Sequence, residues 1–464
     1  MNDRASKQRV IEVRSPYDGE VVGTVPKATV PEVRKAIAAA HAYRARLTRY
    51  ERAALLQRAA ALLRERTVQA SDLITRESGL SKKDSMYEVG RVCDVLTFGA
   101  METLKDDGQV FSCDLTPHGK NRRVFTRRDP LLGVITAITP FNHPMNQVAH
   151  KVVPSIATNN RMVLKPSEKT PLSALYFAEL LREAGLPREM LQVVTGDPRE
   201  IADELIANSH VDLVTFTGGV AVGKSIAAKA GYRRIVLELG GNDPLIVMED
   251  ADLDEAATLA AQGSYKNSGQ RCTAVKRILV HASVHKRFVD LLVARTEAWT
   301  YGDPMAPVEM GTVIDEAAAK LFEARVTEAI AQGARLLAGN RREGALYSPT
   351  VIDRVLPSMT VVKQETFGPV SPVMTFRNID EAIEIANGTA YGLSSAVCTN
   401  RLDYINRFVA ELHVGTVNVR EVPGYRLELT PFGGIKDSGL GHKEGVQEAM
   451  KSFTNLKTFS LPGA

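Results

Sequence analysis

The sequence predicts an α/β protein in which a doubly wound parallel sheet precedes a second α/β unit. Between residues 132 and 230, apolar segments of strand length alternate with turns rich in glycine or proline and with helical segments. This alternation is typical of β–α–β units, whose parallel strands bind ligands at their carboxyl ends. After residue 244 the alternation continues less regularly. At 464 residues the chain exceeds one ordinary core, so two or three domains are expected.

Composition and charge are those of an ordinary globular protein. The chain is 44% hydrophobic and 24% charged, and its net charge of +4 is too small to indicate a polyanionic partner. Its four cysteines form neither a disulfide framework nor C-x-x-C metal ligands, which indicates a reducing compartment. The amino terminus has no apolar signal core, and no apolar run reaches the roughly 18 residues of a membrane span. A cytoplasmic protein is therefore expected.

The first part of the chain is predicted to be helical. Apolar residues recur at helical spacing from Val30 to Ser78, are interrupted at Gly79, and recur from Met86 to Leu104. A hairpin with strands at 109–113 and 124–127 is expected next. It carries the most basic run of the chain, namely Lys120, Arg122, Arg123, Arg127 and Arg128. Such a run can contact nucleic acid, but a charged edge hairpin, or one used in subunit contact, fits the weakly charged chain better.

The predicted doubly wound sheet follows this hairpin. Its strands are expected at 132–139, 162–165, 191–194, 211–217 and 235–239, with helices ending at 157 and covering 172–184 and 220–230. The second unit is expected to have strands at 245–248 and 277–280 and helices at 253–265 and 285–299. A last strand is expected within 450–460, outside this unit. Cys93, Cys113 and Cys398 lie in patterns typical of small buried side chains.

A carboxylate and the remaining cysteine, at the junction of the two units, form the candidate active site. Glu238 lies in an apolar strand, where burial raises the pKa of a carboxyl group and makes it a proton acceptor near neutrality. Cys272 follows 34 positions later among small and polar residues, with Gly269 giving ligand access and Arg271 favouring the thiolate. A thiolate and a carboxylate in a cleft between domains indicate covalent catalysis.

Two other motifs indicate different functions and are weaker. Residues 218–225, GGVAVGKS, match the phosphate-loop pattern of a nucleotide hydrolase, and the acidic strand end 245–250 resembles its magnesium site. That interpretation leaves Glu238 and Cys272 without a role, whereas a helix start with glycines can equally receive the phosphates of a dinucleotide. His281 and His285 have H-x-x-x-H spacing without further ligands, so no metal site is predicted.

Seven motifs in order along the chain resemble those of the aldehyde dehydrogenase superfamily. They are TPFNHP at Asn142, LKPSEKTP at Lys165, FTGGVAVG at Gly218, LELGGNDP at Glu238, NSGQRC at Cys272, QETFGPV at Glu365 and PFGGIKDSGLG around Phe432. The stretch YRLELTPFGGIKDSGLGHKEGV is also similar to that of phosphonoacetaldehyde dehydrogenases. The resemblance covers nearly the whole chain and implies oxidation of an aldehyde to a carboxylate with NAD(P)+.

The resemblance also implies a fold and an assembly. The expected fold is aldehyde dehydrogenase-like, with a Rossmann-type doubly wound cofactor domain, an α/β catalytic domain and a small β oligomerisation arm. The implied NAD-binding domain is 1–113 and 130–240, the catalytic domain 241–430, the return segment 431–444 and the arm 114–129 and 445–464. Because the arm would pair with a neighbouring subunit, a homodimer or homotetramer is expected.

The same resemblance assigns roles to individual residues. Cys272 would attack the aldehyde, the Asn142 amide and the Cys272 N–H would stabilise the oxyanion, and Glu238 would activate the water that hydrolyses the thioester. The residues implied to contact the cofactor are Thr139, Pro140, Lys165, Glu168, Gly218, Gly219, Gly223, Leu239, Glu365 and Phe367. Because the Glu168 carboxylate would accept from ribose hydroxyls and repel a 2′-phosphate, NAD is favoured over NADP. Gly219 stands where many members have serine.

Unusual residues near the implied pocket favour a small anionic aldehyde as the substrate. Arg271 adjoins Cys272, and His143 adjoins Asn142 where an apolar residue is common. Further candidates for substrate binding are Arg420 and Arg426 in one loop and, more weakly, Arg91 on an entrance helix. Guanidinium groups match carboxylate and phosphate oxygens. Phosphonoacetaldehyde, giving phosphonoacetate, is the leading substrate; the alternatives are lactaldehyde, glyceraldehyde 3-phosphate and succinic semialdehyde, or a CoA-acylating reaction.

Overall fold

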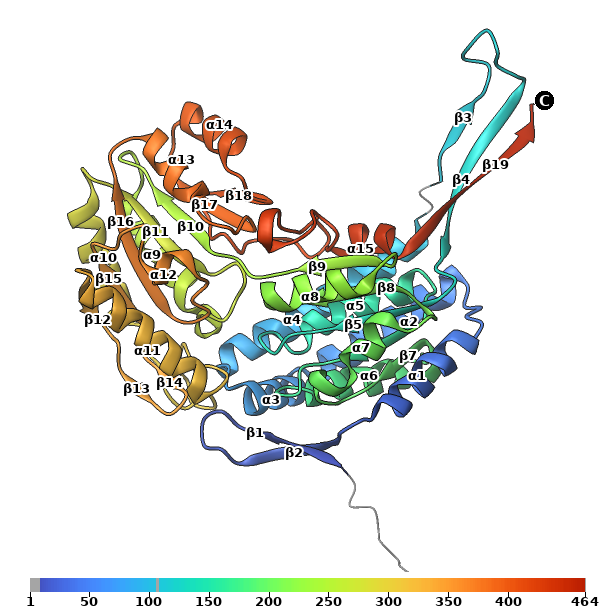
Figure 1. Ribbon diagram of the computed structural model, residues 1–464, viewed down its shortest axis with the longest axis horizontal. Helices are drawn as coiled ribbons and strands as arrows, with labels where there is room; N and C mark the ends of the chain where they lie inside the picture. The colour runs from blue at the N-terminus through green and yellow to red at the C-terminus, as the bar shows by residue number, and fades with distance from the viewer. Residues whose placement is uncertain (1–8, 106–107, 464) are drawn as a thin grey trace, which may run out of the picture.

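The computed structural model describes residues 9–105 and 108–463. Figure 1 shows two α/β bodies joined by the segment between β9 and β10, and a β arm that projects away from the first body. Within the described ranges the strands form a five-stranded sheet, a seven-stranded sheet, a three-stranded arm sheet and two short hairpins. The mixed α/β architecture predicted from the sequence is therefore confirmed.

A hairpin and a set of amphipathic helices precede the first sheet. They are β1 (Val10–Arg14), β2 (Val21–Pro26), α1 (Val30–Ala42), α2 (Arg49–Glu65), α3 (Thr67–Ser78) and α4 (Lys82–Leu104). The predicted interruption at Gly79 is a helix end, because Gly79 has a left-handed φ of 75°. The next helix starts at Lys82 rather than at Met86, since the Ser81 side chain caps its first turn by accepting the Asp84 N–H. The β1–β2 hairpin was not predicted.

The five-stranded sheet is parallel and has the strand order β7-β6-β5-β8-β9. Its strands are β5 (Val134–Ile138), β6 (Met162–Lys165), β7 (Leu191–Val193), β8 (Val211–Thr217) and β9 (Arg234–Glu238). Its helices are α5 (Asn146–Ala157), α6 (Leu172–Glu183), α7 (Pro198–Ala207) and α8 (Val220–Ala230), with the short turn η1 (Arg188–Met190) before β7. The predicted doubly wound order is confirmed, although α7 was not predicted.

Both faces of this sheet are covered by helices. Alternate strand residues belong to different cores, because successive side chains of a strand point to opposite faces. Ile135 and Leu164 pack with α2, α4, α5 and α6, whereas Val134 and Val163 pack with α1, α7 and α8. The strand order reverses between β5 and β8, so the loops after these two strands diverge. A crevice is expected at their carboxyl ends, where Thr139 and Gly218 lie.

The seven-stranded sheet has the order β12-β15-β16-β11-β10-β17-β18, and all its pairs are parallel except β12 with β15. Its strands are β10 (Asp243–Val247), β11 (Val275–His281), β12 (Arg335–Ala338), β15 (Thr350–Asp353), β16 (Val370–Phe376), β17 (Ser394–Cys398) and β18 (Thr416–Val419). One face packs on α9 (Leu253–Tyr265) and α10 (His285–Glu297). The other packs on α11 (Glu316–Ala331), α12 (Thr360–Lys363), α13 (Ile379–Asn387) and α14 (Leu402–Glu411). Smaller elements are η2 (Lys266–Gly269), β13 (Arg342–Glu343), β14 (Leu346–Tyr347) and η3 (Lys436–Ser438).

The projecting arm is an antiparallel sheet in which β4 (Arg122–Pro130) lies between β3 (Val110–Ser112) and β19 (Thr454–Pro462). Figure 1 shows that β19 returns along β4 to the outer part of the arm. The helix before it, α15 (Val446–Ser452), packs against α4 and α5 rather than joining the arm. The pairing therefore places the limits of the arm at residues 110 and 454, not at 114 and 445.

Two of the three cysteines predicted to be buried are buried. They are Cys93 and Cys398, whereas Cys113 is only partly buried because it lies in the turn after β3 rather than in a packed strand.

Within residues 9–105 and 108–463, no helix is long and apolar enough to cross a bilayer.

Candidate active site

The crevice at the switch point is a cavity of about 200 Å³. We call it the sheet-edge cavity; its lining includes Pro140, Asn142, Gly218, Gly219, Leu239, Cys272, Glu365 and Phe367. These residues come from the loops after β5, β8 and β9 and from two loops of the second body. The predicted cysteine and most of the predicted cofactor residues thus meet in one place, between the two sheets.

Glu238 ends β9 and is only 3% exposed. Neither of its carboxylate oxygens has a hydrogen-bond partner among the described residues. Burial, and then the negative charge of Glu444, raises the pKa of Glu238 well above the usual carboxyl value, against smaller effects of Lys151 and Arg426. Burial therefore has the effect on this carboxyl group that the sequence predicted. Glu444 is itself held by Lys151, whose Nζ donates to it at 2.6 Å.

The loop that carries Cys272 has an unusual backbone. Asn267, Ser268 and Gly269 have left-handed φ values of 60°, 54° and 69°. A Cβ at Gly269 would lie 2.3 Å from the carbonyl of Gly368. Gly269 is therefore required for close packing against another loop, and not for ligand access as predicted.

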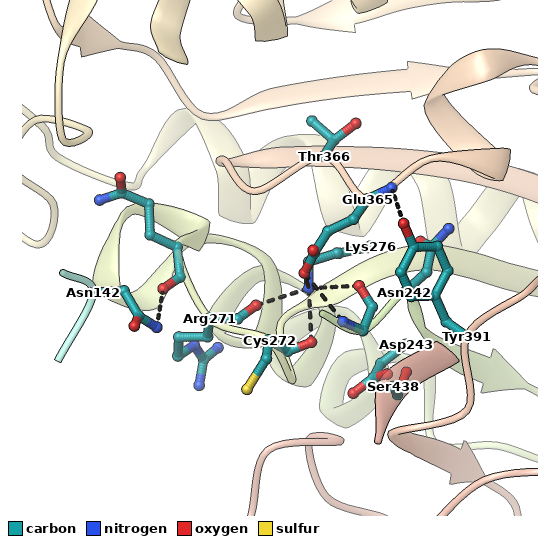
Figure 2. A network of polar contacts seen from close by, with 12 residues as sticks. Asn142, Asn242, Asp243, Arg271, Cys272, Lys276, Glu365, Thr366, Tyr391 and Ser438 are labelled. Atoms are coloured by element: carbon teal, nitrogen blue, oxygen red, sulfur yellow. Dashed lines mark hydrogen bonds and ion pairs between the residues drawn. The ribbon is translucent and has the colours of Figure 1, made fainter. Parts of the chain in front are cut away.

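A buried lysine donates hydrogen bonds to the backbone of this loop. The Nζ of Lys276, on β11, donates to the carbonyl oxygens of Gly241, Arg271 and Cys272 at 3.0, 2.8 and 2.7 Å. It also donates to Glu365 Oε1 at 3.0 Å. Figure 2 shows these contacts converging on one ammonium group, while the Cys272 sulfur points away from it.

The Cys272 thiol has a pKa raised to about 11. Burial is the main cause; Lys276 and Arg426 lower the pKa, and Asp243 and Glu365 raise it. Burial outweighs the nearby cations, although Arg271 and a Cys272 thiolate attract each other, as the sequence predicted. The Arg271 guanidinium also donates to the Gly263 carbonyl, near the end of α9, at 2.7 Å.

Asn142 lies beside the cysteine loop. Its Nδ2 donates to the Gln270 carbonyl at 2.8 Å, and its own carbonyl accepts from Asn267 Nδ2 at 3.0 Å. These bonds fix the loop after β5 to the cysteine loop. Asn142 and Cys272 both line the sheet-edge cavity.

The residues next to Asn142 and Cys272 line a second cavity of about 260 Å³. We call it the arginine cavity, because His143, Arg271, Arg91 and Arg426 all line it. Burial and the charges of Arg91, Arg271 and Arg426 lower the pKa of His143 well below its usual value, so its ring is neutral at pH 7. The structure thus brings four of the five predicted substrate residues together in one cavity.

Buried Glu428 organises two of these arginines. It forms an ion pair with Arg91, accepts from His150 Nε2 at 2.6 Å, and lies 3.7 Å from Arg426 Nε. Burial pushes the pKa of Glu428 upward, but His150 and the two arginines outweigh burial and hold it well below the usual value. The Arg426 Nη1 group is buried and has no hydrogen-bond partner within the described part of the chain. This nitrogen is a cationic donor without an acceptor.

Arg420 does not belong to this group, so its prediction as a substrate residue was wrong. Its guanidinium donates to both carboxylate oxygens of Glu255, at 2.8 and 3.2 Å, and to Asn400 Oδ1 at 2.9 Å. The positive φ of 52° at Arg420 turns the loop there. Its side chain therefore faces α9 on the protein surface.

The other predicted cofactor residues lie along the edge of the first sheet. Thr139 is buried, and its hydroxyl has no partner among the residues described. Lys165 ends β6, and its Nζ donates to the Pro166 carbonyl at 3.0 Å and to Glu168 at 3.2 Å. Gly223 lies in the first turn of α8, where a Cβ would be 2.4 Å from Leu239. Its lack of a side chain lets α8 approach the cavity wall.

The phosphate-loop interpretation was wrong. Residues 220–225 form the first turns of α8, so only the first N–H groups are free for a ligand. Lys224 points to Asp437, at 2.8 Å, rather than back over the turn. The acidic strand end after β10 belongs to the other sheet.

The two histidines of the H-x-x-x-H pattern do not converge. His281 contacts Ser283 and the Arg377 carbonyl, whereas His285 contacts Asp353. No group of three or more metal-capable side chains occurs in the part of the chain that the structure describes.

Lys276 and Glu428 were missed by the sequence analysis. Lys276 lies only four positions after Cys272. The sequence of an apolar strand that contains a lysine does not show whether the lysine side chain is buried or lies at the edge of the sheet. Glu428 follows Arg426 closely, and their alternation with apolar residues could have indicated a half-buried ion pair. Its partners Arg91 and His150 are distant in the sequence, so only the fold identifies them.

Comparisons with known proteins concern the whole chain. A profile of the aldehyde dehydrogenase family matches residues 3–459. The 3-sulfolactaldehyde dehydrogenase of Priestia aryabhattai is 40% identical over 453 residues, 97% of this chain and 94% of that protein. The sulfoacetaldehyde dehydrogenase of Neptuniibacter caesariensis is 39% identical over 414 residues, 89% of this chain and 90% of that protein. The crystal structure of glyceraldehyde-3-phosphate dehydrogenase from Methanocaldococcus jannaschii, complexed with NADP, is similar with a TM-score of 0.94 and 34% identity, covering 98% of this chain and 100% of that chain.

Proposed function

The chain belongs to the aldehyde dehydrogenase family, and from this premise we propose that it oxidises a short anionic aldehyde to the carboxylate with NAD(P)+. The observation that carries the proposal is the arginine cavity, whose lining residues His143 and Arg271 are the chain neighbours of Asn142 and Cys272. Of its described lining residues, Arg91, Lys266, Arg271 and Arg426 are cationic and Asp84 and Glu421 are acidic. The cations exceed the carboxylates by two, which suits a headgroup with one or two negative charges.

The residues of the chain support covalent catalysis. The Cys272 sulfur attacks the aldehyde carbon after losing its proton, and the resulting oxyanion is stabilised by the Asn142 amide and the Cys272 N–H. Such preorganised donors contribute about 3 kcal/mol each to the transition state. Loss of a hydride from the former aldehyde carbon, to a nicotinamide bound in the cavity, would leave a thioester. Glu238, with its raised pKa, then accepts a proton from the water that hydrolyses this thioester. The carboxylate product leaves, and the thiol is regenerated.

The lining of the sheet-edge cavity suits the diphosphate and nicotinamide part of a dinucleotide. Gly219 is the N-cap of α8 and places no side chain over the first turn of this helix. A Cβ at Gly219 would have no atom of the described residues within 4 Å, so the space beside it is open. The N–H groups of that turn are therefore open to a diphosphate. When bound, the nicotinamide supplies the hydride acceptor. Glu365 and Phe367 would position its ribose.

We propose phosphonoacetaldehyde as the first substrate to test, and NAD as the preferred cofactor. The dehydrogenases of 3-sulfolactaldehyde and sulfoacetaldehyde among the relatives act on aldehydes whose anionic group is a sulfonate, so these compounds are the main alternatives. For the cofactor, the Glu168 carboxylate favours ribose hydroxyls over a 2′-phosphate. The relative of known structure that holds NADP makes NADP the alternative.

The test is NADH and NADPH formation by purified protein with each of the three anionic aldehydes, with glyceraldehyde 3-phosphate, and with neutral propionaldehyde. We expect kcat/KM for the best anionic aldehyde to exceed that for propionaldehyde by at least about 100-fold, because two charge-assisted contacts of about 1.5 kcal/mol each are added. A Cys272→Ala variant should be inactive with every substrate. If propionaldehyde is used as well as the anions, the anionic-substrate proposal fails; if a sulfonate leads, phosphonoacetaldehyde is replaced.

We further propose that the arm of β3, β4 and β19 mediates homo-oligomerisation. Leu456, Phe459 and Leu461 of β19 are 43–58% exposed, which is unusual for large apolar side chains on a projecting strand. Sedimentation at micromolar protein should give a dimer or tetramer, and deletion of residues 454–464 should give monomers. A monomer for the full chain would refute this proposal.

A further inference from the structure

Lys276 is buried at the point where three segments of the active site meet. Its side chain is 1% exposed. Its Nζ has four acceptors within 3.0 Å, contributed by Gly241, Arg271, Cys272 and Glu365. Gly241 follows the strand of Glu238, Arg271 and Cys272 form the nucleophile loop, and Glu365 lines the sheet-edge cavity. Figure 2 shows this ammonium group at the centre of the network.

The identity of these acceptors distinguishes Lys276 from a purely structural cation. Its neighbour Arg277 is also buried, but it donates to the carbonyl oxygens of Asn242, Ile385 and Ala386. Lys276 instead combines backbone carbonyls of the nucleophile loop with a carboxylate that faces the cofactor cavity. A buried ammonium requires such compensation, because an unpaired charge is costly in the interior. Displacement of Glu365 would therefore change the balance of forces on the Cys272 backbone.

We propose that Lys276 is a positioning residue that ties the Cys272 loop to Glu365, so that the nucleophile responds to whatever Glu365 contacts. The proposal rests on the function proposed above only in taking Glu365 as a cofactor residue. Gly241 N–H also donates to Glu365 Oε1, at 3.1 Å, so the carboxylate is held from two sides. A ligand that draws Glu365 toward the cavity leaves the lysine with backbone carbonyl acceptors only, two of which belong to the cysteine loop.

The charges around Cys272 give the signs of the expected effects. Lys276 on β11 and Arg426 before α15 lower the pKa of the thiol. Asp243 on β10 and Glu365 before β16 raise it. Removing Lys276 should therefore raise the thiol pKa, and removing the charge of Glu365 should lower it. If Lys276 only packed against the loop, the two substitutions would not shift the thiol pKa in opposite directions.

The experiment measures alkylation of Cys272 by iodoacetamide as a function of pH, in protein without cofactor or substrate. Because only the thiolate reacts, a shift of one pKa unit changes the rate about tenfold at pH values well below the pKa. We expect Lys276→Met to react about tenfold more slowly than the natural protein at pH 7.5, and Glu365→Gln about threefold or more faster. Lys229→Met, at an exposed lysine paired with Asp203, is the matched control and should not differ.

Rates that change in the same direction in Lys276→Met and Glu365→Gln, or that do not change, would overturn the proposal. Asp243, whose pKa burial raises to about 8, titrates in this range but cannot produce opposite signs in the two variants. If Lys276→Met does not fold, Glu365→Gln alone tests the proposal. Its Cys272 must then be alkylated faster than that of the natural protein. Since no aldehyde is used, these outcomes are independent of the substrate proposal.

A second readout tests the coupling. In the natural protein, saturating NAD+ should change the alkylation rate at least threefold, and this response should fall below about twofold in Lys276→Met and in Glu365→Gln. An undiminished response in both variants would show that Cys272 and Glu365 are not linked through Lys276. Protection that persists equally in all proteins would indicate simple shielding of the sulfur and would also refute the coupling.

Discussion

Replacing Arg426 with methionine removes the cationic donor of the arginine cavity while keeping a long side chain over Phe432. In the structure the guanidinium carbon lies 4.0 Å from the centre of that ring, and a thioether can retain part of this packing. The Nη1 group has no partner among the residues described. Under the proposed function, an anionic substrate supplies the acceptor that this nitrogen lacks.

The expected loss follows from that single contact. A hydrogen bond between charged groups contributes about 1.5–3 kcal/mol, which corresponds to about 10- to 150-fold in kcat/KM. Arg426 also lowers the pKa of the Cys272 thiol and of Glu238, so the variant slows every aldehyde to some extent. The ratio of kcat/KM for phosphonoacetaldehyde to that for propionaldehyde removes this common effect. That ratio should fall by about 10- to 150-fold.

Arg420→Met is the matched control, because Arg420 belongs to the same loop but pairs with Glu255 outside the cavity. Exposed ion pairs contribute little, and its ratio should change by less than about twofold. The assay is initial-rate NADH formation with both aldehydes and all three proteins. Equal losses on both substrates in Arg426→Met, or an equal fall of the ratio in Arg420→Met, would refute the assignment of Arg426 to the anion.

Three further changes test other parts of the site and fold. Glu238→Gln should keep the first burst of NADH but slow steady turnover at least about 100-fold, because no base activates the hydrolytic water; stopped-flow loss of the burst would contradict this. Burial raises the pKa of Glu88 to about 7, so the folded state holds a proton that the unfolded chain releases above about pH 4.3, and stability falls as pH rises through 7. Glu88→Gln can still accept the two backbone N–H groups and should therefore gain in Tm over the natural protein between pH 5 and 8; a constant difference would contradict this. Gly219→Ser adds an N-cap hydroxyl and should lower KM for NAD+; a raised KM would show that the open helix end is required.

Much of the fold could be predicted because its physical causes are local. Strands such as Val134–Ile138 and Val211–Thr217 are buried on both faces, so they appear as continuous apolar runs between turn residues. The left-handed Gly79 and the glycine at the start of α8 mark helix boundaries in the sequence itself. Helix α7 was missed although Asp197 and Pro198 are typical of a helix start.

The β1–β2 hairpin and the limits of the arm could not be predicted in the same way. The arm strands bury few side chains, so their apolar pattern is weak, and β4 is defined by its pairing with β19 more than 320 positions away. The start of α15 likewise depends on its packing against α5. Pairing between distant segments leaves little trace in either segment alone.

The sequence by itself determined the residue types of the site: a cysteine, a carboxylate in an apolar strand and an asparagine, in motifs of one family. Only the tertiary structure decided which charged side chains reach them. Arg420 and Arg426 are six positions apart, yet one pairs with Glu255 on α9 and the other lines the cavity beside Glu428. The choice depends on which carboxylates the fold brings within about 4 Å, because ion pairing is a short-range interaction between groups that the chain order does not place together.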